Sequence, residues 1–355
     1  MGARQVGKTT LLRSIFGDNK DVLWLSGDEA DVRAIFDNVT STRLAQYIGK
    51  CTTVIIDEAQ RISDIGIKLK LITDHIPGVQ LIATGSSSFE LANKTNEPLT
   101  GRKWEFTLFP LSFGEMVGEN GLLNEKRLLP HRLVFGYYPD VVTHPGDEKE
   151  ILTTLSNSYL YKDIFSTDKI KKTDNIVKLL QAIAYQIGSE VSMNELAQLC
   201  SIDPKTVERY INMMEQAYII FRLSSFSRNL RNELKHSRKI YFYDNGIRNA
   251  VIGNFSQIEA RGDVGQLFEN FVISERIKLQ RYQHSYAHSW FWRTTSRQEI
   301  DYIEETDGTL AAYEIKWNPR RKTSVPQSFV TAYPKTTFQK ITQDNIEDFL
   351  LATVE

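Results

Sequence analysis

The stretch GARQVGKTT at residues 2–10 decides the fold, because it fits the pattern G-x-x-x-x-G-K-[ST] at its full spacing. Its two glycines let the backbone approach an anion closely, and N–H groups at the start of the following helix point at that anion. The pattern predicts a nucleotide-phosphate site, with Lys8 on the β- and γ-phosphates and the Thr9 hydroxyl on Mg²⁺. The residues expected to contact ATP are Gly2, Gln5, Gly7, Lys8, Thr9 and Thr10.

A helix should follow this loop, because four apolar residues between positions 11 and 16 share one helical face. A phosphate-binding loop of this kind normally hangs from a buried parallel strand, yet only Met1 precedes Gly2. We therefore expect the codons upstream of Met1 to encode a short apolar strand, either because the start codon was placed too late or because the sequence is a fragment.

Composition sets bounds on the function. The 355 residues suffice for two or three domains. With 43 basic and 44 acidic residues the chain has no general attraction to nucleic acid, so a DNA contact would need a local patch. Cys51 and Cys200 lie far apart in apolar surroundings, which indicates buried thiols in a reducing, cytoplasmic compartment. No apolar run reaches the roughly 18 residues that a membrane span needs, so no membrane partner is expected.

Short apolar runs alternate with amphipathic stretches in the first third of the chain, which is typical of an α/β fold with a parallel sheet. The expected strands are residues 22–26, 53–56 and 79–84. The second strand runs into Asp57-Glu58, a Walker B pattern. Ligands bind at the carboxyl ends of such strands, so Asp57 should act on Mg²⁺ and Glu58 should polarise the attacking water.

Two further residues are weaker candidates for contact with the γ-phosphate. Ser86 follows the third strand, where a phosphate sensor would lie, although serines at such positions are often turn or cap residues. Arg102 could meet the γ-phosphate in its own chain or in a neighbouring copy, or could be an ordinary surface arginine.

At this point the sequence resembles a known family. The segments, in chain order, are GARQVGKTTLL, VIIDEAQ, LIATGSSS, LTGR, LFPLSFGEM, FGYYPDVV and SYLYKDI. They are similar to those of prokaryotic AAA-type ATPases that carry a C-terminal domain of unknown function, and the similarity spans almost the whole chain. The resemblance implies an ATP-binding core, a helical lid, a winged-helix segment and a restriction-nuclease-like end.

The middle of the chain suits this order. Residues 122–165 have a helical pattern that is interrupted at Gly136-Tyr137-Tyr138-Pro139, as in a small helical lid. A helix at 192–200, capped by Ser192 with Glu195 three residues on, precedes a turn and a second helix at 206–218. Together they predict a helix-turn-helix, with residues 219–223 and 239–243 as a wing.

DNA contact through this segment stays open. Lys205 and Arg209 on the second helix are offset by Glu208 and Glu215, which makes a poor phosphate-binding face. The expected wing is more basic, with Arg228, Arg231, Lys235, Arg238 and Lys239. The alternative to DNA binding is docking within the molecule.

Near the end of the chain, strand-like runs at 299–304 and 312–317 flank Asp307-Gly308, the strongest hairpin-turn dipeptide. A turn centred there places Asp301 opposite Glu314. Two facing carboxylates repel each other unless a positive group lies between them, and a metal ion is the simplest such group.

Asp301, followed by Glu314-x-Lys316 across a hairpin and preceded by a helical Glu269, is similar to the PD-(D/E)XK nuclease site. The resemblance implies Mg²⁺ on Asp301 and Glu314, with Glu269 beside them and Lys316 stabilising charge or helping to activate water. The alternative is the solvated face of an edge hairpin, in which Lys316 pairs with Glu299 or Glu314.

The fold class expected is therefore α/β. An AAA-type parallel sheet, its first strand apparently missing, occupies residues 1–120, a helical lid 121–170, a winged-helix-like segment 171–245 and a nuclease-like α/β domain 246–355. The function indicated is that of a Mg²⁺-dependent ATPase whose nucleotide state controls a nuclease-like domain acting on DNA. The alternatives are a nucleotide-dependent switch or scaffold with a catalytically silent C-terminal domain, and a chain with neither activity. A homo-oligomer is compatible with the first two.

Overall fold

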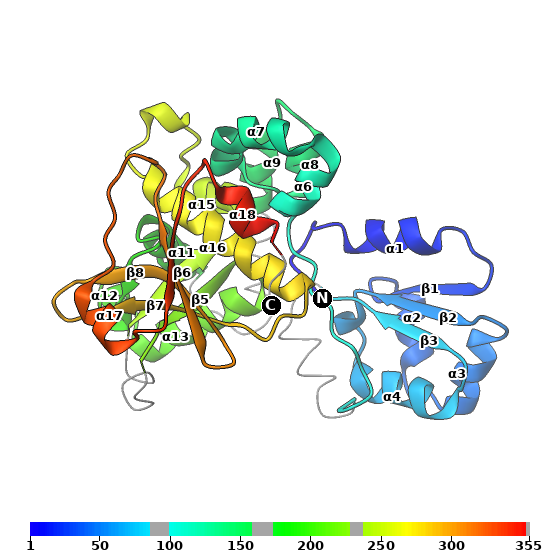
Figure 1. Ribbon diagram of the computed structural model, residues 1–355. Coiled ribbons are helices and arrows are strands. Elements are labelled where there is room, and N and C mark those ends of the chain that lie inside the picture. The colour runs from blue at the N-terminus through cyan, green and yellow to red at the C-terminus, as the bar shows by residue number, and fades with distance from the viewer. Residues whose placement is uncertain (86–98, 158–172, 228–236, 353–355) are drawn as a thin grey trace. The chain divides into compact units, whose positions relative to one another are not determined.

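The computed structural model describes residues 1–85, 99–157, 173–227 and 237–352 (Figure 1). These residues form two compact units. The first consists of Met1–Leu108 with Gln216–Tyr218, and the second of Phe109–Glu215 with Ile219–Glu355. The candidate sensor Ser86, the segment 158–164 and the wing residues Arg228, Arg231 and Lys235 lie outside the described residues.

The first unit is built on a parallel sheet of three strands in the order β1-β2-β3. The strands are β1 (Val22–Ser26), β2 (Thr53–Asp57) and β3 (Gln80–Ala83), which confirms the three predicted strands to within one residue at each end. The helices are α1 (Lys8–Phe16), α2 (Ala30–Phe36), α3 (Ser41–Ile48) and α4 (Ile65–His75), with a short η1 (Ala59–Arg61) after β2. This mixed α/β arrangement is compatible with a P-loop fold.

Strand β2 is central in this sheet and carries the acidic pair at its carboxyl end. Val54, Ile55 and Ile56 are completely buried, as expected of a parallel strand covered on both faces. Asp57, the last residue of β2, is half-buried. The apolar strand therefore delivers a carboxylate to the edge of the sheet where ligands bind.

Helix α1 follows the P-loop as predicted, but none of its residues is buried in the described part of the chain. Leu11 is 46% exposed and Ile15 is 62% exposed. The apolar face that the sequence predicted is thus present and lies on the surface of the described residues.

The second unit begins with helices in the region predicted to be helical. They are α6 (Phe113–Asn120), α7 (Leu122–Phe135), α8 (Pro139–Thr143) and α9 (Glu148–Leu155). Gly136 ends α7 with φ of 71°, and a Cβ there would lie 2.2 Å from a carboxylate oxygen of Asp244. Only glycine avoids both the clash and the strain, which explains the predicted break. The role of these helices as a lid on the ATPase region stays a prediction.

A mixed sheet of seven strands, in the order β10-β9-β8-β7-β5-β6-β4, forms the centre of the second unit. The strands are β4 (Glu190–Val191), β5 (Ile220–Ser225), β6 (Arg238–Phe242), β7 (His288–Arg293), β8 (Glu299–Thr306), β9 (Thr309–Ile315) and β10 (Thr337–Ile341). Strands β5 and β6 pair as the predicted wing, and β5 also pairs in parallel with β7. The segments expected as a winged helix and as a nuclease-like domain therefore share one sheet, and the boundary proposed between them stays a prediction.

The remaining helices of this unit are α11 (Thr173–Tyr185), α12 (Met193–Cys200), α13 (Pro204–Gln216), α15 (Asn245–Ile252), α16 (Val264–Tyr282), α17 (Gln327–Ala332) and α18 (Ile346–Leu350), with η3 at Ile258–Ala260. The Ser192 side chain caps α12 by accepting from the N–H of Glu195, as predicted. The second helix, α13, starts at Pro204, two residues before its predicted start, because proline suits the first turn of a helix.

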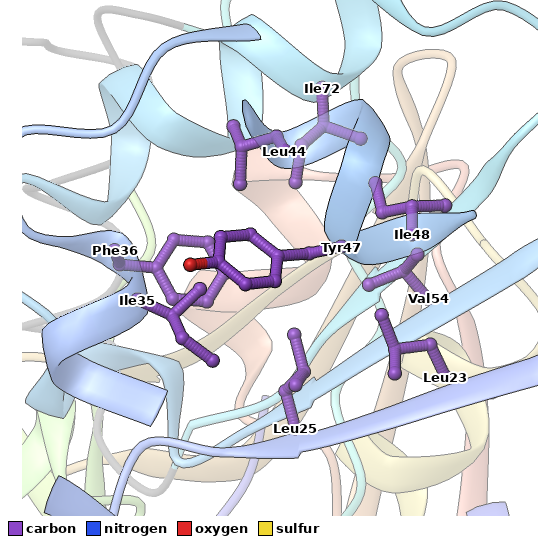
Figure 2. Close-up of a pocket in the computed structure, with 9 residues that line it drawn as sticks. All are labelled: Leu23, Leu25, Ile35, Phe36, Leu44, Tyr47, Ile48, Val54 and Ile72. Atoms are coloured by element: carbon purple, nitrogen blue, oxygen red, sulfur yellow. The ribbon is translucent and has the colours of Figure 1, made fainter. Parts of the chain in front are cut away.

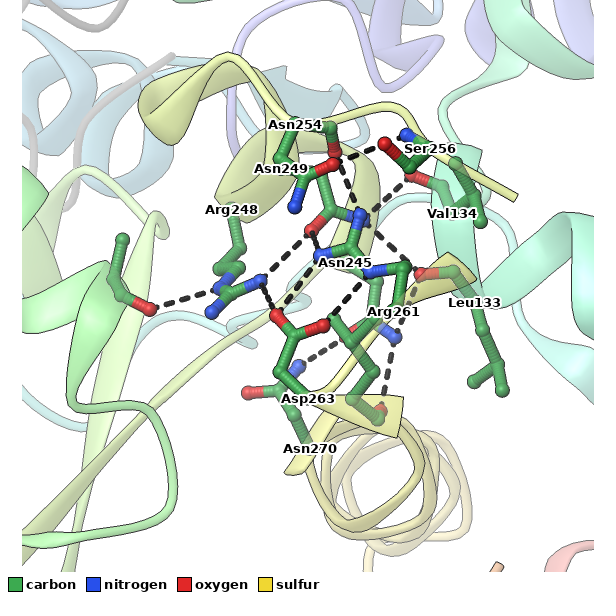
Figure 3. A network of polar contacts seen from close by, with 12 residues as sticks. Leu133, Val134, Asn245, Arg248, Asn249, Asn254, Ser256, Arg261, Asp263 and Asn270 are labelled. Atoms are coloured by element: carbon green, nitrogen blue, oxygen red, sulfur yellow. Dashed lines mark hydrogen bonds and ion pairs between the residues drawn. The ribbon is translucent and has the colours of Figure 1, made fainter. Parts of the chain in front are cut away.

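A buried polar network joins α7, α15 and α16 (Figure 3) and extends to β6 through Asn270. Asn249 donates to the carbonyls of Leu133 and Val134, at 3.2 and 2.8 Å. Asn270 accepts from the N–H of Phe242 at 2.7 Å and donates back to its carbonyl at 3.0 Å. Carbonyls at a helix end have no partner within the helix, so the Asn249 amide satisfies groups that burial would otherwise leave unpaired.

Candidate functional sites

The P-loop glycines occupy positions that only glycine fits well. Gly7 has φ of 90° where α1 begins, and Gly2 has φ of 155°. A Cβ on Gly2 would lie 2.1 Å from the carbonyl oxygen of Leu108. This close approach arises because the N–H of Leu108 donates to the carbonyl of Met1 at 2.7 Å.

Lys8, which is predicted to contact the β- and γ-phosphates, has its ammonium group against the backbone of the P-loop. Its Nζ donates to the carbonyl oxygens of Gly2 and Ala3 at 3.0 and 2.7 Å. Gln5 has φ of 56°, a left-handed conformation that is uncommon for a residue with a side chain. The loop thus surrounds the Lys8 ammonium with backbone, which is where a P-loop lysine must lie to reach a bound phosphate.

The residues predicted to hold Mg²⁺ meet. The Thr9 hydroxyl donates to Asp57 Oδ2 at 2.7 Å, which joins the P-loop to the end of β2. A third residue, Thr84, completes the group by donating its hydroxyl to Asp57 Oδ1. The backbone N–H of Glu58 also approaches this oxygen, at 3.1 Å. Two hydroxyls and a carboxylate are hard oxygen donors of the kind that Mg²⁺ prefers.

Thr84 was missed as a functional residue by the sequence analysis, which placed it in the third strand. It is the residue after β3, is only 7% exposed, and lies beside the end of β2 because the two strands are parallel. A polar residue at the carboxyl end of an apolar strand was the available signal.

Glu58, the predicted catalytic base, follows Asp57 with φ of 47°. Its Oε2 accepts from the Gln60 side chain at 2.6 Å. Gly27 packs against it so closely that a Cβ would lie 2.4 Å from the Glu58 carbonyl oxygen. A left-handed backbone at a non-glycine residue costs about 1–3 kcal/mol and is typical of residues positioned for function.

Arg102 lies beside a carboxylate. Its Nε is 3.1 Å from Asp74 Oδ1, and the Arg102 side chain is 47% exposed. An exposed ion pair of this kind contributes little to stability, so Arg102 remains available to a phosphate. Its role as a γ-phosphate ligand stays a prediction, as does the role of Thr10 at the start of α1.

The first unit also contains an apolar pocket of about 110 Å³ between the sheet and its helices. Figure 2 shows the ring of Tyr47 in the middle of the residues that line the pocket, with the ring of Phe36 beside it and Leu44 above it. The lining is apolar apart from the Tyr47 hydroxyl, so this pocket suits no phosphate. The predicted nucleotide site is a different place, the polar cluster of Thr9, Asp57 and Thr84 at the carboxyl end of β2.

In the second unit the predicted hairpin forms with the predicted register. Strands β8 and β9 are antiparallel and pair from Thr306–Thr309 to Tyr302–Tyr313. Asp301 and Glu314 are the next residues on the two strands. The Nζ of Lys316 lies between their carboxylates, at 2.8 and 2.7 Å. The positive group between the facing acids is therefore a lysine ammonium.

Glu269, on α16, is held by residues of the predicted wing. Lys239 Nζ lies 3.2 Å from Glu269 Oε1 and 2.5 Å from Glu299 Oε1. The Tyr241 hydroxyl donates to the same oxygen of Glu269 at 2.7 Å. The sequence predicts Lys239 in a basic wing, and no local pattern links it to Glu269, because β6 joins the sheet of the C-terminal segment only in the folded chain.

Burial dominates the electrostatics of this cluster. It raises the pKa of Glu269 to about 6, with Lys239 opposing the shift and Asp301 adding to it. Burial likewise raises the pKa of Glu314, again with a contribution from Asp301. In Lys316 burial would lower the pKa, but Asp301 and Glu314 outweigh it and raise the pKa above its usual value.

The fit of this cluster to a metal ion is limited. In the four described ranges, no three His, Cys, Asp or Glu side chains are grouped so as to hold a metal. Asp301 and Glu314 are the pair that face each other, and Lys316 bridges them. The cluster opens into a pocket of about 740 Å³. Its lining includes Glu269, Arg293, Glu299, Lys316, Trp317 and Arg321.

The acidic residues of α13 are paired with the wing. Arg222 contacts Glu208 at 2.6 Å and Glu215 at 2.5 Å, and Arg238 contacts Glu208 at 2.9 Å. Two basic residues of β5 and β6 are therefore engaged by helix α13. This pairing favours the docking alternative over a DNA-binding face made by these particular residues.

No helix among the described residues is long and apolar enough to cross a membrane.

Comparison with family models divides the chain into three parts. Residues 1–117 match an AAA domain, which supports a P-loop, AAA-type, ATPase-like N-terminal region that binds nucleotide. Residues 126–258 and 264–348 match domains of unknown function, DUF8612 and DUF4143. The second of these begins at α16 and includes Glu269, Asp301 and Glu314.

Several relatives are similar over most of the chain. An uncharacterized protein from Mycobacterium tuberculosis is 25% identical over 92% of this chain and 70% of its own length. One from Methanocaldococcus jannaschii is 23% identical over 98% of this chain and 85% of its own length. A crystal structure of protein VC1899 from Vibrio cholerae matches 94% of this chain and 97% of its own at 11% identity, but its TM-score of 0.16 supports no argument.

Proposed function

We propose that the first unit binds ATP with Mg²⁺ and hydrolyses it, and that the nucleotide state controls the second unit. The observation that supports this best is the meeting of Thr9, Asp57 and Thr84 beside the P-loop that holds Lys8. The match of residues 1–117 to an AAA domain agrees with it.

The proposed roles follow from where charge lies during phosphoryl transfer. Lys8 and the loop N–H groups would bind the β- and γ-phosphates, and Thr9 with Asp57 would hold Mg²⁺, directly or through water. Mg²⁺ supplies charge neutralisation for the phosphate oxygens. Glu58, whose Oε2 accepts from Gln60, would be the carboxylate that polarises the attacking water.

Two substitutions test these roles. Lys8→Ala should abolish tight ATP binding, because Lys8 contacts the phosphates already in the ground state. Glu58→Gln should retain ATP binding and lose turnover, because Glu58 acts only when water attacks. Nucleotide binding by fluorescence and phosphate release measure the two effects, with Glu29→Gln as a matched surface control. Equal loss of binding in both variants would remove Glu58 from the proposed role.

A second candidate function is metal-dependent cleavage of DNA by the C-terminal segment. The convergence of Asp301, Glu314 and Lys316 across the hairpin favours it. Asp301 and Glu314 would hold a divalent ion, and Glu269 and Lys316 would stabilise charge or position water. For a metal to enter, the Lys316 ammonium must leave the space between the two carboxylates.

The alternative is a catalytically silent second unit that serves as a nucleotide-dependent switch or scaffold for DNA or protein. The lysines that neutralise the carboxylates favour this alternative. A panel of single- and double-stranded DNA, incubated with Mg²⁺ or Mn²⁺ with and without ATP, discriminates the two. Cleavage that disappears in both Asp301→Asn and Lys316→Met would support the nuclease, and no cleavage under any condition would support the silent domain.

A further inference from the structure

Lys239 is a buried cation placed between carboxylates that come from two different elements of the second unit, α16 and β8. Its side chain is 1% exposed, and its Nζ contacts Glu269 of α16 and Glu299 of β8. The same Nζ lies 5.4 Å from the centre of the Phe291 ring on β7. A lysine held on several sides in this way cannot turn out to solvent without unpacking β6 from the sheet.

The ammonium stays charged. Burial by itself would lower the pKa of Lys239, but Glu269, Tyr241, Glu299 and Asp301 together raise it well above the usual range. A divalent cation bound by Glu269 would therefore face a fixed positive charge about 3 Å from the same oxygen. Two positive charges beside one carboxylate oxygen repel each other strongly where burial lowers the effective dielectric constant.

Other groups of the cluster are also neutralised from within the chain. Lys316 bridges Asp301 and Glu314, and Arg293 lies 3.2 Å from Glu190 and 3.5 Å from Glu299. Of the carboxylates named here, Glu269 is the one that receives both a lysine and the tyrosine hydroxyl on one oxygen. It is thus the acid least able to serve as a metal ligand while Lys239 is in place.

We propose that Lys239 is a built-in cation that keeps Glu269 out of any divalent-metal site, so that a divalent ion reaches Glu269 only when this ammonium is removed. Lys239 belongs to β6, the second strand after helices α12 and α13, so a residue from the middle of the chain supplies a positive charge to the C-terminal cluster. The cluster is then a set of internal ion pairs. Of its carboxylates, only Asp301 and Glu314 could bind a metal ion while Lys239 is in place.

Mn²⁺ binding to the full chain tests the proposal, measured by calorimetry in the absence of nucleotide. We expect Glu269→Gln to bind Mn²⁺ with the wild-type affinity, within about twofold. Lys239→Met should tighten Mn²⁺ binding at least tenfold, and the gain should vanish in the double variant Lys239→Met/Glu269→Gln. Lys126→Met, which removes a lysine paired with Glu347 on another face of the unit, controls for the lost charge.

Removal of a buried charge can unfold the unit, so a balanced variant is included. Lys239→Met/Glu299→Gln removes one charge of each sign, and circular dichroism checks that it folds. It should show the same gain in Mn²⁺ affinity as Lys239→Met. If neither variant folds, the comparison of the wild type with Glu269→Gln decides alone.

Two results would overturn the proposal. One is a tenfold or larger loss of wild-type Mn²⁺ affinity in Glu269→Gln, which would make Glu269 a ligand despite Lys239. The other is a folded Lys239→Met or balanced variant that binds Mn²⁺ no more tightly than the wild type. Neither result bears on ATP hydrolysis by the first unit, which the phosphate-release assay follows separately.

Discussion

The hydroxyl of Thr84 orients the carboxylate of Asp57. By donating to Oδ1, it leaves the other oxygen, Oδ2, directed at Thr9, where the metal is proposed to bind. Thr84→Val keeps the volume and removes the donor. Groups that orient a metal-binding carboxylate typically change metal affinity or activity by about 10–100-fold. We expect a loss of that size in the Mg²⁺ dependence of ATP turnover, with Thr84→Ser close to the wild type.

Glu269 should make stability depend on pH. Its pKa is raised from 4.5 to about 6 in the folded chain. The folded state therefore binds the proton more tightly than the unfolded state, and this contribution is complete below pH 4.5 and is lost as the pH rises through about 6. The free energy of unfolding should fall by about 2 kcal/mol across that window. Denaturant titrations of the wild type and Glu269→Gln at pH 4.5, 5.5 and 7 measure it, and an identical pH dependence in the two proteins would contradict the shift.

At the scale of the element, the β8–β9 hairpin depends on its turn. Asp307 has φ of 49° and Gly308 has φ of 78°, the pair of left-handed residues that a two-residue hairpin turn requires. Gly308→Ala should cost about 1–2 kcal/mol, because a side chain is disfavoured in that conformation. Chemical denaturation measures it, with Gly262→Ala as the control, since Gly262 has open space around it and no strained φ. An equal, small effect of both substitutions would show that the turn does not set the register.

The register of the β8–β9 hairpin also decides whether Asp301 and Glu314 lie on the same face of the sheet. A slip of one residue would turn Asp301 and Glu314 to opposite faces and separate Asp301 from Lys316. The two-residue turn and the buried Tyr302 and Ile303 oppose such a slip. The element thus positions the acids, whether they serve a metal or only the lysine.

At the scale of the whole molecule, the two units have separate cores, and each should respond to its own substitutions. Asn249 is fully buried and bonded to the end of α7, so Asn249→Leu leaves the carbonyl of Val134 without its amide donor, while Asn245 still donates to the carbonyl of Leu133. We expect a loss of about 1–3 kcal/mol, the cost of one unsatisfied buried carbonyl.

Scanning calorimetry with and without ATP should show that loss in the second unit only. The transition that ATP raises belongs to the first unit and should keep its midpoint in Asn249→Leu. Asn124→Leu, at an exposed position on α7, is the matched control. A shift of both transitions together would mean that the units unfold as one.

The sequence by itself determined the local features of this protein. The strands at 22–26 and 53–57, the break at Gly136, the cap at Ser192 and the Asp307-Gly308 turn are each set by residues within a few positions of one another. Apolar periodicity, capping and turn chemistry act over that range, so the pattern in the chain predicts them. The P-loop and the acidic pair Asp57-Glu58 could be predicted for the same reason, because each motif is defined by the spacing of residues that are close together in the sequence.

Only the tertiary structure decided which charges meet. Lys239 and Glu269 come from different elements, and nothing in either segment indicates the other until β5 pairs with β7 and α16 packs on β6. Thr84 likewise contacts Asp57 only because β2 pairs with β3. The physical reason is that an ion pair or hydrogen bond across a sheet depends on register and packing between distant segments. Local sequence predicted the register of the β8–β9 hairpin from its turn, but it does not encode the pairing of β5 with β7 or of β2 with β3. It therefore left open whether a metal ion or Lys316 lies between Asp301 and Glu314, and the folded chain places the lysine ammonium there.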